Sequence, residues 1–211
     1  MIKEIFVLRH GETDFNKQGL VQGSGIDAPL NDLGFAQSDA FFEKYSKTTF
    51  DKIYLSGLRR THETILPFIE MGIPYERHDG LNEINWGDFE GKVVNNGSRS
   101  YYKNLIDNWK MGNIEQSIKG GESPADVARR QRPFIDLMYD RKEENRILIC
   151  MHGRAMRVIM CQLLNRPLSE MEEFHHHNTG LYVLKANYLE RRAEVVLQNC
   201  TAHLESVNII Q

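Results

Sequence analysis

The chain has 211 residues, of which 41% are hydrophobic and 26% charged, and its formal net charge is -3. These values are ordinary for a soluble globular protein with one sizeable core. The negative charge argues against a nucleic-acid partner, since nucleic-acid-binding proteins normally present a basic face. The sequence shows no signal peptide and no apolar run long enough to span a bilayer, so we expect a cytoplasmic protein with no membrane partner.

The three cysteines, Cys150, Cys161 and Cys200, form no C-x-x-C pair. Two of them lie in or beside apolar runs. We therefore expect buried thiols in a reducing compartment, and neither disulfides nor a cysteine metal site.

The first apolar run of the chain ends at a basic pair. The run from Ile5 to Leu8 predicts a fully buried strand of a parallel sheet, and Arg9-His10-Gly11 follow directly. In open α/β sheets, ligands bind at the carboxyl ends of the strands. A guanidinium and an imidazole at that edge suit an anionic substrate and chemistry near neutral pH. Taken alone, the tripeptide fits equally well a surface charge followed by a histidine bonded to a backbone carbonyl.

The rest of the chain alternates helices with strands. We expect helices over 35–45, 59–71, 101–110, 124–141 and 155–164, and strands over 52–55, 146–151, 180–184 and 193–197, the last two as a hairpin. Ser123 is the expected N-cap of the fourth helix, with Pro124 at its first position. The alternation predicts an α/β fold, a three-layer αβα sandwich around a mostly parallel sheet with an antiparallel edge. We expect a single domain over 1–211, with a candidate helical lid at about 92–121.

Basic side chains follow three of the predicted strands. Arg9 and His10 follow the first, Arg59 and Arg60 the second, and His152 the third. If these strands are neighbours, the basic groups meet at one edge of the sheet. They would repel one another without an anion between them, and arginine donates bidentate hydrogen bonds that match phosphate oxygens. The sequence therefore predicts a phosphoryl-binding site.

The motifs at these positions resemble those of the histidine phosphatase superfamily, also called phosphoglycerate mutase-like. They are Leu8-Arg9-His10-Gly11-Glu12-Thr13, Ser56-x-Leu58-x-Arg60, Leu81-Asn82-Glu83 with Gly87 and Glu90-Gly91, and His152-Gly153, in the order of the family. They spread over residues 5 to 160, and the remainder matches only in its pattern of elements. The resemblance implies a phosphoglycerate mutase-like fold and a metal-independent phosphatase without a cofactor. Its partner would be a small phosphorylated metabolite.

The resemblance also implies the role of each site residue. His10 would be the nucleophile that carries a phosphohistidine, while Arg9, Arg60 and His152 hold the phosphoryl oxygens. The spacing in the family selects Arg60 over Arg59. Glu83 would protonate the leaving alkoxide and then activate water. The further substrate contacts are Asn16, Gln22 and Gly23 in a glycine-rich loop over 16–31, and Gly153.

These roles are physically consistent. Positioned cations stabilise the charge of a loose phosphoryl-transfer transition state, and nearby arginines tend to keep His10 neutral. A general acid must hold a proton among those cations. We expect partial desolvation of Glu83, against Trp86, and the bound dianion to make this possible.

Two other functions stay open. The 2,3-bisphosphoglycerate-dependent phosphoglycerate mutases of the family are longer, with a basic insertion after the glutamate loop. Here that segment contains only Lys92, Arg99, Lys103, Lys110 and Lys119, which favours a phosphatase. A non-catalytic phospho-ligand-binding protein is the other alternative, and the complete catalytic set argues against it.

Two groups of side chains beside the motifs bear on the substrate. Candidate substrates range from sugar phosphates to α-ribazole phosphate, and the aromatic residues Tyr101, Tyr102 and Trp109 suit a substrate with a ring if they face the pocket. For the tract from His175 to His177, adjacent side chains point in different directions. A solvated segment or a substrate-side loop is therefore favoured over a metal site. Nothing is assigned to His62 or His78.

Overall fold

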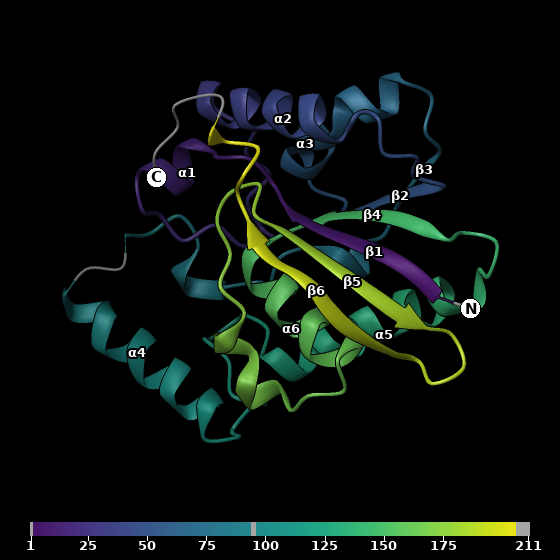
Figure 1. The fold of residues 1–211 in the computed structure, drawn as a ribbon. Helices are drawn as coiled ribbons and strands as arrows, with labels where there is room; N and C mark the ends of the chain where they lie inside the picture. The colour runs from purple at the N-terminus through teal and green to yellow at the C-terminus, as the bar shows by residue number, and fades with distance from the viewer. Residues whose placement is uncertain (1, 94–95, 206–211) are drawn as a thin grey trace.

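The computed structural model describes residues 2–93 and 96–205. In this part of the chain, six strands form one sheet in the order β3-β2-β4-β1-β5-β6 (Figure 1). The strands are β1 (Ile2–Arg9), β2 (Lys52–Leu55), β3 (Tyr75–Arg77), β4 (Arg146–Met151), β5 (Leu181–Asn187) and β6 (Arg192–Cys200). The first four strands are parallel, β5 is antiparallel to β1, and β6 is antiparallel to β5. The mixed sheet confirms the predicted fold class.

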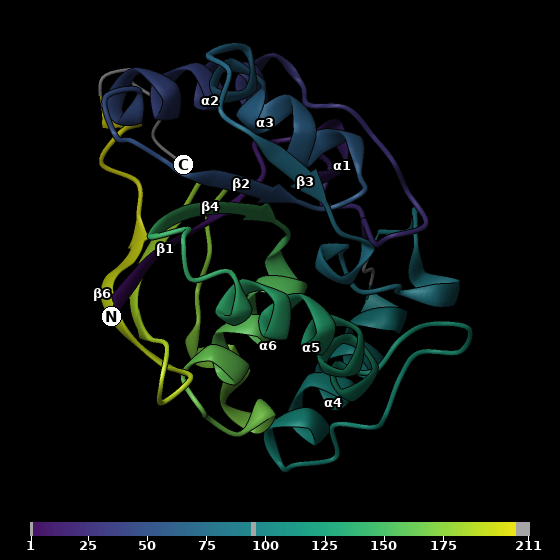
Figure 2. The same ribbon diagram turned by 90° about the vertical axis from the view of Figure 1, so that its right-hand side faces the viewer.

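Helices cover both faces of this sheet. They are α1 (Asp14–Lys17), α2 (Asp32–Tyr45), α3 (Arg59–Glu70), α4 (Asn96–Lys110), α5 (Pro124–Asp140) and α6 (Gly153–Leu163), with 3-10 helices η1 (Asp79–Leu81), η2 (Gly87–Phe89) and η3 (Leu168–Glu173). α2 and α3 lie on one face and α5 and α6 on the other, with α4 beyond them on that side (Figure 2). Within the described residues, none of the helices combines the length and apolarity that a membrane crossing needs.

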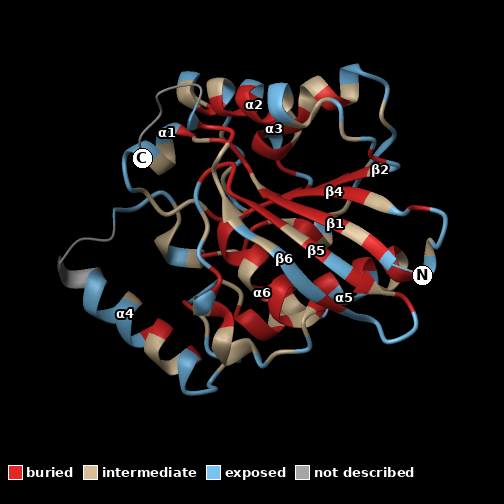
Figure 3. Cartoon of the chain, viewed as in Figure 1, coloured by how far each residue is buried: buried red, intermediate tan, exposed pale blue. Residues whose placement is uncertain are grey.

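The unbroken apolar run of β1 is explained by cover on both faces. Ile5 and Val7 belong to the core that α5 and α6 share, whereas Phe6 and Leu8 belong to the core formed with α2 and α3. Successive side chains of a strand point to opposite faces, so both sets are needed. All four side chains are buried, and β1 is red over its middle part in Figure 3. The site at the end of β1 thus stands on a rigid support.

Some boundaries differ from the prediction. β3 was not anticipated because it is a short edge strand, and its exposed side chains leave no apolar run in the sequence. The terminal hairpin is longer than predicted, and α4 begins at residue 96. α5 begins as predicted, with a capping box in which Ser123 and Asp126 each bind the backbone N–H of the other. The three cysteines are all free thiols, with the first two buried.

Candidate active site

The carboxyl ends of β1, β2 and β4 lie side by side at one edge of the sheet. In the parallel register Arg9 pairs with Met151, and Leu55 pairs with Cys150. The backbone N–H of His10 donates to the Met151 carbonyl at 3.0 Å. His152 follows Met151, and the ring centroids of His10 and His152 lie 5.1 Å apart. The structure therefore brings together the basic side chains that follow separate strands in the sequence.

His10 is only 3% exposed, and its ring is held by a hydrogen bond of 2.7 Å between Nδ1 and the Gly11 carbonyl. Because a carbonyl oxygen can only accept, Nδ1 carries the proton and Nε2 keeps its lone pair. Burial and the guanidiniums of Arg60 and Arg9 lower the pKa of His10 well below 6.5. The ring is therefore neutral at pH 7, which is the form that a nucleophile requires.

The chain directly after His10 lies tightly against the first turn of α2. The Gly11 N–H donates to Thr64 Oγ1 on α3 at 2.9 Å. A Cβ on Gly34 would lie 2.1 Å from the Glu12 carbonyl oxygen, and one on Gly11 would lie 2.6 Å from the Gly34 oxygen. Only glycine permits this approach of two backbones. The two glycines thus fix the course of the chain that bears His10.

Arg60 is fully buried in the first turn of α3, and all three of its nitrogens have partners. Its Nε donates to His152 Nδ1 at 3.1 Å, and its two terminal nitrogens donate to the carbonyls of Ile26 and Gly23 at 2.7 and 3.3 Å. Burial is the main cause that lowers the pKa of Arg60 to about 10, so it remains a cation at pH 7.

Both ring nitrogens of His152 bind the protein. Since Nδ1 accepts from Arg60, the proton is on Nε2, which pairs with Ser56 Oγ at 2.7 Å. Burial, followed by the charge of Arg60, lowers the pKa of His152 well below 6.5. In this arrangement His152 orients the guanidinium of Arg60. A bond from its Nε2 to a phosphate would replace the bond to Ser56.

Two buried donors near His10 have no partner among the described residues, namely Arg9 Nε and Gln22 Nε2. The oxygen of Gln22 accepts from Thr13 Oγ1 at 2.8 Å, so the amide NH₂ of Gln22 is the group left over. Burial lowers the pKa of Arg9 to about 10, against the opposing charge of Glu83, and Arg9 is still a cation at pH 7. Buried donors without acceptors are costly, and the oxygens of an anion would satisfy them.

Asn16, a predicted substrate contact, is hydrogen-bonded to Asn178, which the sequence analysis did not identify. Its Oδ1 accepts from Thr13 N and from Asn178 Nδ2, both at 3.2 Å, and its NH₂ makes no hydrogen bond with the residues that the structure describes. The buried Asn178 also donates to the His10 carbonyl at 3.1 Å. Nothing in the sequence marks Asn178, because it is a single polar residue in a loop.

Glu83 is 7% exposed and lies at the N-terminus of α6. Its Oε1 accepts from the N–H groups of Ala155 and Ile84 at 2.8 and 2.9 Å, and its Oε2 accepts from Arg154 N at 3.0 Å. The amides of a helix N-terminus are a favourable environment for a carboxylate. Since α6 begins directly after His152, this contact ties Glu83 to the same strand end as the histidines.

The aromatic residues divide between core and cleft. Trp86 packs on Tyr102 and on the fully buried Trp109, with ring centroids 5.5 and 6.0 Å apart. A cleft of about 590 Å³ lies between the loop at 18–22 and α4, and Gln22, Trp86, Arg99 and Tyr102 contribute to its walls. Of the three aromatic residues that would suit a ring substrate if they faced the pocket, Tyr102 lines this cleft. Trp109 does not meet that condition, because its side chain is fully buried in the core.

Tyr101 packs on Phe89 instead, with ring centroids 5.5 Å apart.

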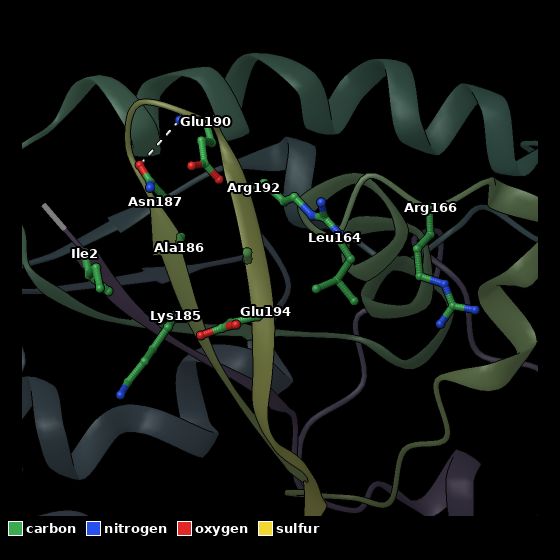
Figure 4. A pocket seen from close by; sticks show the side chains of 10 residues that line it. Ile2, Leu164, Arg166, Lys185, Ala186, Asn187, Glu190, Arg192 and Glu194 are labelled. Atoms are coloured by element: carbon green, nitrogen blue, oxygen red, sulfur yellow. Dashed lines mark hydrogen bonds between the residues drawn. The ribbon is translucent and has the colours of Figure 1, made fainter.

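Another cleft, of about 530 Å³, lies at the opposite end of the sheet. Its walls include Ile2, Lys185 and Arg192 (Figure 4). It shares no residue with the site at the end of β1.

The histidine tract has one ring turned inward. His175 and His177 are exposed, whereas His176 covers Gly153 so closely that a Cβ there would lie 2.5 Å from the ring. Burial and the charges of Arg9, Arg157 and Arg154 lower the pKa of His176 to about 2. In the part of the chain that the structure describes, no group of three or more His, Cys, Asp or Glu side chains is placed to hold a metal ion.

Comparison with known proteins places this geometry in a family. The family model of the histidine phosphatase superfamily (branch 1) matches residues 5–201. Phosphoserine phosphatase 1 of Hydrogenobacter thermophilus is 30% identical over 206 residues, which are 97% of this chain and 95% of that protein.

Solved structures have the same fold. A mycobacterial glucosyl-3-phosphoglycerate phosphatase superposes with a TM-score of 0.84 at 23% identity, covering 95% of this chain and 100% of the other. A phosphoserine phosphatase from Entamoeba histolytica, in complex with 3-phosphoglyceric acid, gives a TM-score of 0.79 at 23% identity, covering 96% and 99%. From the family match over nearly its whole length, this chain belongs to the histidine phosphatase superfamily.

Proposed function

We propose that this protein is a phosphomonoesterase that hydrolyses a small phosphorylated metabolite through a phosphohistidine on His10. One observation carries the proposal: His10 is buried and neutral with an unprotonated Nε2, and the guanidiniums of Arg60 and Arg9 lie near enough for their charges to act on its ring. Arg9 directly precedes His10 and Gln22 accepts a hydrogen bond from Thr13, and we propose that their unpartnered donors bind phosphoryl oxygens. Family membership, and relatives that are named phosphatases, support the same reaction.

In the first step the lone pair of His10 Nε2 attacks phosphorus. The N–P bond forms as the bond between phosphorus and the leaving oxygen breaks. Arg9 and Arg60 stabilise the charge on the phosphoryl oxygens, with His152 orienting Arg60. Glu83 gives its proton to the leaving alkoxide. Its Oε2 accepts one backbone N–H, and the second lone pair of that oxygen is the place for the proton.

In the second step the Glu83 carboxylate takes a proton from water as the water oxygen attacks phosphorus. The N–P bond breaks, its electrons return to His10, and inorganic phosphate leaves. The chain supplies the nucleophile of the first step, the carboxyl group that donates and then accepts a proton, and the cations of both steps, while water is the nucleophile of the second step. We therefore propose catalysis without a metal ion.

We further propose that α4 acts as a lid and that the cleft between α4 and the loop at 18–22 receives the leaving group. Arg99 and Tyr102 on α4 line the cleft that reaches Gln22, so closing of α4 over this cleft would cover the leaving group. The segment at 92–121 has no pair of adjacent arginines, which supports a hydrolase over a mutase. The three free thiols support a reducing, cytoplasmic location.

A panel of phosphomonoesters tests the function, with phosphate release measured in the presence of a chelator. We expect turnover by the wild type and a loss of about 1,000-fold or more in His10→Ala. His175→Ala, which changes an exposed ring of the histidine tract, is the control and should keep full activity.

Three outcomes would contradict the proposal. Turnover that survives His10→Ala would exclude the nucleophile. Phosphate binding without any turnover would indicate a phospho-ligand-binding protein. Conversion between phosphoglycerates that requires the bisphosphate primer would indicate a mutase.

A further inference from the structure

Glu83 lies in a segment with no regular structure of its own, between η1 and η2. Backbone carbonyls of such a segment need partners from elsewhere. Arg130 on α5 supplies two of them. One terminal nitrogen donates to the Gly80 carbonyl at 2.7 Å, and the other donates to the Glu83 carbonyl at 3.0 Å. A single guanidinium thus holds the main chain of Glu83 itself.

Glu122 fixes this guanidinium in turn. Arg130 donates to both carboxylate oxygens of Glu122, at 2.8 and 3.1 Å, in a bidentate pair. The same carboxylate accepts from the Asn85 N–H at 2.8 Å, and the Glu122 N–H donates to the Asn85 carbonyl at 2.8 Å. The pair of Arg130 and Glu122 therefore holds the chain on both sides of the Glu83 side chain.

The helix α5 also holds Ala155, one of the residues whose backbone N–H groups bind the Glu83 carboxylate. Gln131, next to Arg130, is fully buried and donates to the Ala155 carbonyl at 2.8 Å. Ala155 is the residue whose N–H binds the Glu83 carboxylate. A Cβ on Gly80 would lie 2.6 Å from the Arg130 carbonyl, so the segment lies directly on the backbone of α5. Residues of α5 therefore hold both the main chain of Glu83 and a residue that binds its carboxylate.

We propose that Arg130, held by Glu122, is a positioning residue that aims the Glu83 carboxyl at the leaving oxygen. This inference rests on the proposed role of Glu83 as general acid. Misplacement of an acid by a fraction of an ångström slows the step in which it gives its proton. Alkyl phosphates need that proton because an alkoxide is a poor leaving group. Aryl phosphates with an acidic phenol need it far less.

The test compares kcat/KM for an alkyl phosphomonoester with kcat/KM for p-nitrophenyl phosphate. This parameter reports steps up to departure of the leaving group, so hydrolysis of the phosphohistidine does not enter it. We expect Arg130→Ala to lower kcat/KM about 10- to 100-fold for the alkyl ester and less than about threefold for the aryl ester. We call this difference between the two losses the alkyl–aryl split. Glu83→Gln should show the same split, larger in size.

Two further variants keep the test informative if Arg130→Ala is poorly folded. Arg130→Lys retains the positive charge but not the planar set of N–H donors, and should show a smaller split in the same direction. Arg129→Ala, which removes the exposed neighbour that pairs with Asp126 and Glu115, is the matched control and should show no split.

Two results would overturn the inference, and they differ from each other. Equal losses on both esters in the Arg130 variants, with a clear split in Glu83→Gln, would show that Arg130 supports the fold without aiming the acid. The absence of a split in Glu83→Gln would refute the acid role of Glu83 and remove the basis of the inference.

Discussion

Lowering the pH from 7 to 5 should destabilise the fold through three histidines at the site. Burial lowers the pKa of His10, His152 and His176 below the ordinary value of 6.5. Between the folded pKa and 6.5, the unfolded chain binds more protons than the folded protein. The free energy of unfolding therefore falls as the pH drops below 6.5.

The size of the effect follows from the same linkage. For one histidine that stays neutral in the folded state, the loss between pH 7 and pH 5 is about 2 kcal/mol, and for three it is about 6 kcal/mol. Carboxylates with a lowered pKa change the free energy of unfolding only at lower pH. The hydrogen bond from Arg141 is the main cause that lowers the pKa of Glu76 to about 2, so its stabilising effect is present above 4.5 and is lost below it. The histidines therefore dominate between pH 5 and pH 6.5.

Urea unfolding at the two pH values, in phosphate-free buffer, measures this difference. Phosphate is left out because a bound anion raises the pKa of the histidines around it. His176→Gln should reduce the pH-dependent loss by about 2 kcal/mol. His175→Gln, at the exposed neighbouring position, should leave the loss unchanged. A wild-type loss below about 1 kcal/mol, or an equal loss in His176→Gln and the wild type, would refute the reasoning.

Three other substitutions test the packing. Gly34→Ala would bring a Cβ 2.1 Å from the Glu12 oxygen, so we expect kcat/KM to fall more than about tenfold; full activity would contradict the tight approach. Lys3→Met leaves Glu144 and two carbonyls at the end of α5 without the buried amine, and should cost about 3 kcal/mol in urea unfolding with KM unchanged. A loss confined to activity would contradict that account. Ser123→Ala removes the N-cap of α5 and should cost about 1 kcal/mol, seen as a lower Tm; an unchanged Tm would show that the cap contributes little.

The sequence predicted the parts of the site that depend on local pattern. An apolar run ending at Arg9-His10 marks a strand end, and parallel strands end at one edge of a sheet, so the sequence predicted that His10 meets His152 if their strands are neighbours. The structure shows that β1 and β4 are neighbours. Glu83 needed the family resemblance, because its segment has neither helical nor strand period. The roles of these residues remain predictions until the variants are assayed.

Other features depend on contacts between residues that are far apart in the sequence. Arg130 binds carbonyls of residues about 50 positions away, and a bond to a carbonyl leaves no mark on the residue that accepts it. Asn178 could not be predicted for the same reason. Helical spacing showed that Tyr102 and Trp109 lie on a helix, but it does not tell which face meets the cleft and which meets the core.

The most direct test of the mechanism is to trap the phosphoenzyme. Glu83→Gln, mixed with p-nitrophenyl phosphate and quenched rapidly, should accumulate a phosphoryl group because water is no longer activated while the good leaving group still departs. Peptide mass spectrometry should place that group on His10, with the acid lability of a phosphohistidine, and His10→Ala should carry none. A phosphoryl group on another residue, or turnover by the wild type with no phosphoenzyme at any time, would contradict the account.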